Sequence, residues 1–128
     1  MTEPAVQVDD LRIRSAAGTI LDKTALVVER GERVGLVGES GSGKSTLSLA
    51  LLGSIAPGLE LAAGNVTVLN VPVVADGRLA SPGTLRKLRR PVARLDQDPA
   101  GELTPTRRIG YLMTELSRGP REDAQRLR

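Results

Sequence analysis

Histidine and cysteine are both absent from this chain of 128 residues. Their absence excludes disulfides, a thiol nucleophile, zinc sites built from Cys and His, and acid–base catalysis by imidazole. Aromatic residues are nearly absent too, because Tyr111 is the only one. The core must therefore be built from aliphatic side chains, and the chain lacks the aromatic platforms on which single-stranded nucleic acids stack.

Long apolar runs are also lacking. No stretch approaches the length that crosses a bilayer, and the first ten residues, MTEPAVQVDD, lack the basic and apolar regions of a signal peptide. We therefore expect a cytoplasmic chain, and its length fits one domain with a moderate core.

Charge is divided unevenly along the chain. Residues 1–76 contain six Lys or Arg and nine Asp or Glu, a net charge of −3, whereas residues 77–128 contain twelve and six, a net charge of +6. A basic half of this kind can bind nucleic acid or an anionic membrane surface. Because aromatic residues are not interleaved with the arginines and no nucleic-acid-binding motif is present, we interpret it as a solvated face and expect no nucleic-acid partner.

The stretch GLVGESGSGKSTLSLALLG at residues 35–53 contains the pattern G-x-x-x-x-G-K-[ST]. In this pattern the backbone N–H groups of a glycine-rich loop surround phosphates, the lysine contacts the β- and γ-phosphates, and the hydroxyl binds Mg²⁺. Lys44 and Ser45 occupy these two positions. We expect nucleotide to be bound by the whole loop, which consists of Gly38, Glu39, Ser40, Gly41, Ser42, Gly43, Lys44, Ser45 and Thr46.

The residues on either side of this loop have the pattern that the motif requires. Residues 33–38 (RVGLVG) form a short apolar run typical of a buried strand, and residues 44–52 have a helical pattern that Gly53 ends. A strand, a loop and a helix in this order present the phosphate to a helix N-terminus, where free N–H groups and the helix dipole favour anions.

The first strand is expected at residues 6–14, and its apolar residues change phase along its length. Val6 and Val8 share one face of a regular strand, whereas Leu11 and Ile13 share the other. This change of phase predicts a β-bulge near residues 9–10.

The remaining elements follow from periodicity and from turn residues. We expect turns at residues 15–18 and 75–83, a loop at residues 54–64, and strands at residues 24–32, 65–73 and 92–95. A short helix is expected at residues 84–90, a longer one from Thr106, and the start of another at residues 121–128. These elements predict an α/β fold, namely part of a P-loop NTPase core with a small antiparallel β subdomain.

A second motif distinguishes among the many classes of phosphate-loop protein. Residues 95–105 (LDQDPAGELTP) resemble the Q-loop of ATP-binding cassette (ABC) proteins, and most closely that of the oligopeptide, dipeptide and nickel importer branch. In that branch FQDP, then LNP, then a helix containing IG recur in this order. The resemblance covers about residues 5–118, and its matching residues here are Gln97, Asp98, Pro99, Leu103, Thr104, Pro105, Ile109 and Gly110.

This resemblance implies that residues 1–128 are the N-terminal part of an ABC-type ATP-binding domain. ATP and Mg²⁺ would be its cofactors, and Ser45 and Gln97 would meet the Mg²⁺, with Gln97 also positioning the attacking water. The Q-loop region would face a transmembrane permease subunit, and a second cassette subunit would supply the signature motif. The protein would then be the ATPase subunit energising an importer for peptides or nickel, on the inner face of the cell membrane.

Departures from the family pattern favour an alternative. The signature LSGGQ, the apolar strand ending in Asp-Glu (the Walker B motif) and the later histidine (the H-loop) have no match in the chain. The alternative is a truncated, catalytically incompetent module that binds nucleotide or docks a partner. Residues 14–19 (RSAAGT) also lack the aromatic ring that the family places against adenine, and Asp96 replaces the aromatic before the glutamine. We therefore expect the base to be held loosely.

A GTPase is a further alternative. Residues 98–101 (DPAG) fit the D-x-x-G pattern of GTPases, whose glycine senses the γ-phosphate. The chain lacks the Asn-Lys-x-Asp motif that recognises guanine, which makes this interpretation weaker than the cassette.

Overall fold

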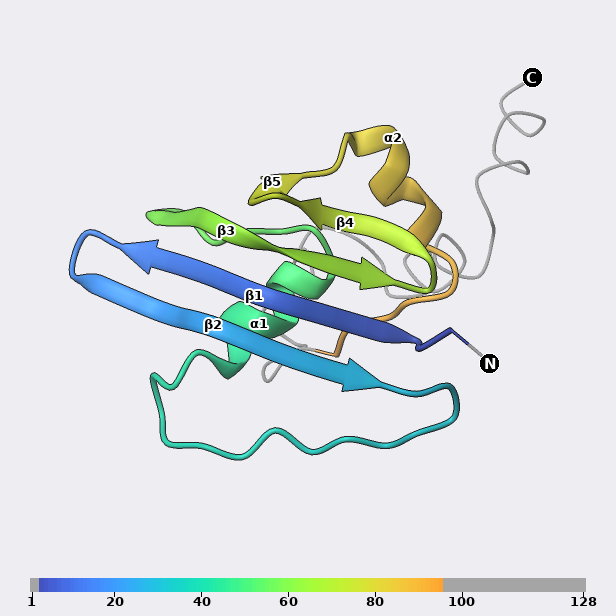
Figure 1. Cartoon of the computed structure of the whole chain (residues 1–128), viewed down its shortest axis with the longest axis horizontal. Coiled ribbons are helices and arrows are strands. Elements are labelled where there is room, and N and C mark those ends of the chain that lie inside the picture. The colour runs from blue at the N-terminus through green and yellow to red at the C-terminus, as the bar shows by residue number, and fades with distance from the viewer. Residues whose placement is uncertain (1–2, 96–128) are drawn as a thin grey trace, which may run out of the picture. The chain divides into compact units, whose positions relative to one another are not determined.

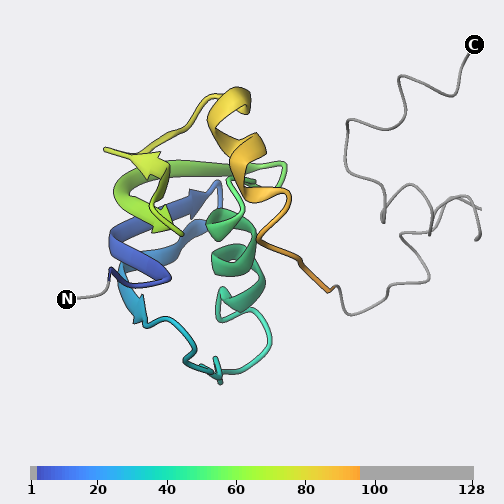
Figure 2. The same ribbon diagram turned by 90° about the vertical axis from the view of Figure 1, so that its right-hand side faces the viewer.

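The computed structural model describes residues 3–95, of which residues 3–93 belong to one compact unit and the last two to a second unit. The compact unit is a five-stranded antiparallel sheet with the order β2-β1-β3-β4-β5, and helix α1 covers one of its faces (Figures 1 and 2). Its elements are β1 Val6–Ser15, β2 Gly18–Val28, α1 Lys44–Leu51, β3 Leu59–Val68, β4 Val71–Ala75, β5 Arg78–Leu79, α2 Pro82–Leu85 and the 3₁₀ helix η1 Arg86–Leu88.

The predicted bulge in β1 is confirmed. The register of β1 shifts between Val8 and Leu11 against β2 and between Asp9 and Arg12 against β3, and Asp10 has a φ of 49°. The extra residue turns the second half of the strand over, so that Val8, Leu11 and Ile13 are all fully buried in the same core.

Gly64 of β3 lies directly opposite this bulge. A Cβ built on Gly64 would lie 2.5 Å from Leu11 Cα and 2.7 Å from the carbonyl oxygen of Asp10, and its φ is +106°. The bulged backbone of β1 can approach β3 this closely only because residue 64 has no side chain.

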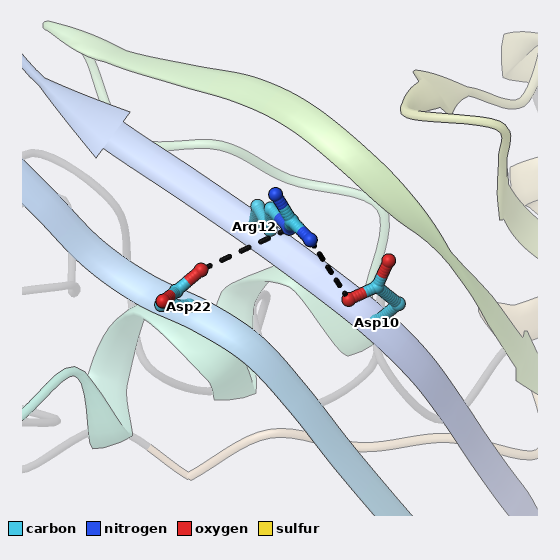
Figure 3. Close-up of polar contacts among 3 residues, drawn as sticks. All are labelled: Asp10, Arg12 and Asp22. Carbon is cyan, nitrogen blue, oxygen red and sulfur yellow. Dashed lines mark hydrogen bonds and ion pairs between the residues drawn. The ribbon is translucent and has the colours of Figure 1, made fainter.

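Arg12 lies just after the bulge, on the sheet face away from α1, between two carboxylates (Figure 3). Its Nη2 is 3.4 Å from Asp10 Oδ1, and its Nε is 3.8 Å from Asp22 Oδ1. The second of these ion pairs joins β1 to β2. Because the two carboxylate side chains are 58% and 67% exposed, these ion pairs contribute little to stability.

The core is aliphatic throughout the described residues, as the composition predicts. It lies between the sheet and α1, which contributes Leu47 and Ala50, and it extends to Leu88 of η1. The other buried members are Val8, Leu11, Ile13, Leu21, Val66, Val68, Val73 and Val74.

Two tight turns connect β3, β4 and β5. The Asp76–Gly77 turn, with φ values of 49° and 70°, lies in the stretch where turn residues predict it. The turn at Leu69 and Asn70, with φ values of 47° and 64°, was not expected. It divides the single strand predicted at residues 65–73 into the end of β3 and the start of β4.

The helical segments agree with prediction to different degrees. Helix α1 starts at Lys44 and ends before Gly53, whose φ is 71°, as expected. The helix expected at residues 84–90 starts earlier and consists of α2 followed by η1. It starts earlier because Ser81 caps α2 by accepting a hydrogen bond from the Thr84 N–H at 3.2 Å, and because Pro82 occupies its first turn. None of the helices in residues 3–95 is long and apolar enough to cross a bilayer.

The strand predicted at residues 33–38 is wrong. Residues 32–39 have no regular secondary structure, and Figure 1 shows them as a thin tube running from the end of β2 back to α1. Val34 and Leu36 are each 44% exposed and Val37 is 99% exposed. A parallel strand forms only against neighbouring strands, and within the described residues none pairs with this segment.

Three further predictions need correction. The strand predicted at residues 92–95 is also absent, and Leu95 is 93% exposed. Residues 54–64, predicted as a loop, contain the first half of β3, and the strand predicted at residues 24–32 is the second half of β2, which starts at Gly18 and ends at Val28. The helices predicted from Thr106 and at residues 121–128 lie outside the described residues.

We expect Gly64→Ala to lower the free energy of unfolding by about 3 kcal/mol, because the new methyl group meets backbone atoms that cannot rotate away and the φ is unfavourable for alanine. Urea denaturation followed by far-UV circular dichroism measures this loss. Gly58→Ala is the matched control, since Gly58 has a φ of +81° but a Cβ built on it would have nothing within 4 Å. It should cost only about 1 kcal/mol, and equal losses would contradict the close approach at Gly64.

We expect the 128-residue chain to self-associate through residues 33–37. This extended segment exposes apolar surface, and its backbone groups make no hydrogen bond within residues 3–95. Val37→Lys should weaken the association at least about tenfold while changing the free energy of unfolding by less than about 0.5 kcal/mol. Sedimentation velocity over a range of concentrations measures the association. Leu79→Lys, at a side chain that is 42% exposed on β5, is the control; an equal effect there would point to a different surface.

Candidate functional site

The phosphate loop connects the extended segment at residues 32–39 to the first turn of α1. A turn within it is closed by a hydrogen bond from the Ser42 N–H to the Glu39 carbonyl oxygen at 3.2 Å. Its residues are exposed except for Gly43, which is buried, and Lys44 and Thr46, which are partly buried. The loop is therefore open to solvent and anchored at its C-terminal end.

Gly43 is the anchor and the N-cap of α1. Its φ is 90°, and a Cβ built on it would lie 2.7 Å from Leu21 Cδ2 and 3.3 Å from the Ile20 carbonyl oxygen. Strand β2 therefore holds the start of the helix in place. The sequence motif identifies Gly43 but gives no signal for its neighbours Ile20 and Leu21, which were not expected to support the site.

Within residues 3–95, no hydrogen-bond acceptor occupies the N-terminus of α1. Its N-cap makes no side-chain hydrogen bond, its first turn contains no acidic residue, and the first helical bond runs from the Leu47 N–H to the Gly43 carbonyl oxygen at 2.8 Å. The N–H groups of Lys44, Ser45 and Thr46 therefore have no acceptor within the helix. These N–H groups and the helix dipole make the position favourable for phosphate.

Lys44 bends back over the loop instead of extending into solvent. Its ammonium group donates to the carbonyl oxygens of Gly38 at 2.6 Å and Glu39 at 2.7 Å, and to Ser42 Oγ at 3.0 Å. The loop thus holds its one positive side chain beside the free N–H groups of the helix, which concentrates the donors and the positive charge that a polyphosphate requires.

A magnesium ion would depend on Ser45 and on oxygens that a nucleotide brings. The Ser45 side chain is exposed at the start of α1. Among residues 3–95, no group of three or more Asp, Glu, His or Cys side chains lies together as a ready-made metal site. In nucleotide sites Mg²⁺ is usually bound by one or two protein groups together with phosphate oxygens and water.

Gln97 of the Q-loop motif is the other predicted site residue, and residues 14–19, at the tip of the first hairpin, are the stretch without the expected aromatic ring. Gln97, Asp96 and the rest of the Q-loop motif up to residue 105 lie outside the described residues, apart from the exposed Leu95. The hairpin tip at residues 14–19 is described. Its Ser15 hydroxyl donates to the Gly18 carbonyl oxygen at 3.2 Å and accepts from the Ala17 N–H at 3.2 Å, so this polar group is already used within the turn.

Comparison with known families identifies the class to which this loop belongs. The sequence profile of the ABC transporter family matches residues 21–125, which include the phosphate loop and the Q-loop motif. The chain therefore belongs to the ABC transporter family. This confirms the resemblance seen in the sequence and leaves the D-x-x-G pattern at residues 98–101 without support as a GTPase motif.

The similar relatives are named as peptide import ATP-binding proteins. One from Brucella abortus is 36% identical over 118 residues, which cover 89% of this chain and 33% of the relative. One from Brucella melitensis is also 36% identical over 118 residues, covering 89% of this chain and 30% of the relative. One from Brucella ovis is 39% identical over 102 residues, covering 80% and 30%. The chain thus spans about a third of the length of these relatives.

Proposed function

We propose that residues 38–46 bind the triphosphate of ATP together with Mg²⁺. The observation that carries this proposal is the position of the Lys44 ammonium group, which hydrogen bonds to Gly38, Glu39 and Ser42 hold over the loop, next to the free first-turn N–H groups of α1. Membership in the ABC family, whose members bind nucleotide, typically with Mg²⁺, supports the same conclusion.

We further propose that the chain is the nucleotide-binding part of the ATPase subunit of an importer for peptides or nickel. Support comes from the FQDP-like and LNP-like motifs at residues 97–105 and from the names of the relatives, which are peptide import ATP-binding proteins. In this role Gln97 would meet Mg²⁺ and the attacking water, since its amide oxygen can accept from water and coordinate a hard cation.

The proposed assembly has two partners. The Q-loop region would contact a transmembrane permease subunit at the cytoplasmic face of the membrane. A second cassette subunit would supply the signature motif that the 128 residues lack.

The second candidate function is a nucleotide-binding or docking module without turnover. It concerns the polypeptide of these 128 residues alone, which contains no LSGGQ, no Asp-Glu strand and no histidine. This function shares the phosphate site with the first and differs from it only in hydrolysis.

Calorimetric titration of the chain with Mg-ATP should give one site per chain. Lys44→Ala should raise the dissociation constant at least about tenfold, because a charge-assisted hydrogen bond to phosphate contributes about 1.5–3 kcal/mol. Lys23→Ala, at an exposed lysine of β2, is the matched control and should leave binding unchanged. Indistinguishable titrations of wild type and Lys44→Ala would refute the phosphate-site assignment.

The 128-residue chain alone should show no ATP turnover above the background of the Lys44→Ala variant, because its sequence contains no Asp-Glu strand, signature or histidine to complete the reaction. A coupled phosphate-release assay at saturating Mg-ATP measures this. Turnover that Lys44→Ala abolishes would show that the chain hydrolyses ATP by itself and would exclude the second candidate function.

A further inference from the structure

The ammonium group of Lys44 has every proton engaged within the phosphate loop. An ammonium group has three N–H donors and no acceptor. Its three partners are the Gly38 carbonyl oxygen at 2.6 Å, the Glu39 carbonyl oxygen at 2.7 Å and Ser42 Oγ at 3.0 Å. A phosphate oxygen can therefore bind this ammonium group only by replacing or sharing one of these three.

The three partners differ in how easily they can leave. The two carbonyl oxygens belong to the backbone, and the path of the loop fixes them next to Lys44. Ser42 Oγ is at the end of an exposed side chain that turns about a single χ1 bond, and its distance to Nζ is the longest of the three. Ser42 is thus the partner that can move away without rearrangement of the loop.

We infer that Ser42 is a positioning residue that holds Lys44 over the loop and gives up its contact when a phosphate oxygen binds. This inference rests on the proposed function of residues 38–46. The hydroxyl of Ser42 acts as a stand-in for a phosphate oxygen, because both accept a hydrogen bond from the same ammonium proton. Ser42 therefore keeps the lysine near its working position but competes with the ligand.

Gly38 makes this contact possible. A Cβ built on Gly38 would lie 2.7 Å from Ser42 Oγ, which is too close for the hydroxyl to stay where it is, and 3.3 Å from Ser42 Cβ, a tight contact. It would be 3.7 Å from Lys44 Nζ, an ordinary contact. The close atom of Ser42 is the tip of a side chain that can rotate. Gly38→Ala would therefore turn the hydroxyl away and shift Ser42 Cβ by a few tenths of an ångström, while its methyl group makes only an ordinary contact with Lys44 Nζ.

The contact between Ser42 and Lys44 can be tested without any ligand by the reactivity of the lysines. The chain contains only three, Lys23, Lys44 and Lys87. Trace acetylation followed by mass spectrometry gives all three rates in one sample, with the exposed Lys23 and Lys87 as internal standards. Ser42→Ala should speed the acetylation of Lys44 about threefold or more relative to these standards, and Ser42→Thr, which keeps a hydroxyl, should restore the slow rate.

Gly38→Ala provides an independent route to the same result. It should speed the acetylation of Lys44 as Ser42→Ala does, and the double variant should be no faster than either single one, because all three remove the same contact. An unchanged Lys44 rate in Ser42→Ala, or additive effects in the double variant, would overturn the inference.

Titration with Mg-ATP and with magnesium pyrophosphate tests the competition. Ser42→Ala should bind both ligands about three- to tenfold more tightly than wild type, since the lost hydrogen bond competes with the bond from Lys44 to phosphate. Ser54→Ala, at an exposed serine after α1, is the matched control and should bind like wild type.

The outcomes separate the inference from the function on which it rests. Failure of wild type and all variants to bind either ligand would refute the phosphate site, while the acetylation rates would still decide whether Ser42 holds Lys44. Wild-type binding together with equal or weaker binding by Ser42→Ala would overturn the competition and retain the site.

Discussion

The packing of α1 against the sheet is the interaction on which the phosphate loop depends. Leu47 and Ala50 are buried in the core, and Gly43 at the start of the helix lies against Leu21 of β2. The sheet thus holds the helix both along its length and at its first residue. Because the free N–H groups of the first turn point along the helix axis, this support also sets the direction in which a phosphate is received.

Features that follow from local chemistry could be predicted from the sequence. The start and end of α1, the bulge near Asp10 and the turn at Asp76 and Gly77 each depend on a few adjacent residues with strong preferences. The turn at Leu69 and Asn70 could not be predicted, since a leucine with a positive φ is uncommon and nothing in the sequence distinguishes it from a strand residue. The strand predicted at residues 33–38 is wrong for a different reason. Their apolar pattern is typical of a buried strand, and such a strand is buried only where neighbouring strands pair with it.

The sequence predicts which residues form the candidate site better than it predicts the contacts that they make. The motif identifies Lys44, Ser45 and the glycines, and the match of residues 21–125 to the ABC transporter family agrees with it. The contacts of Lys44 within the loop depend on the rotamer of Ser42 and on the space beside Gly38, which no spacing rule describes. The role of Gln97 stays a prediction, since it lies beyond the described residues.

The purely aliphatic core has a practical consequence for spectroscopy. The chain has no tryptophan or phenylalanine, and its one tyrosine, Tyr111, lies outside residues 3–95. The packed sheet and helix are therefore silent in near-ultraviolet absorption and in intrinsic fluorescence, and the amide backbone is their only natural chromophore. A tryptophan introduced near the loop would be the only indole in the chain, and Tyr111 would be the only other aromatic side chain to contribute to its fluorescence.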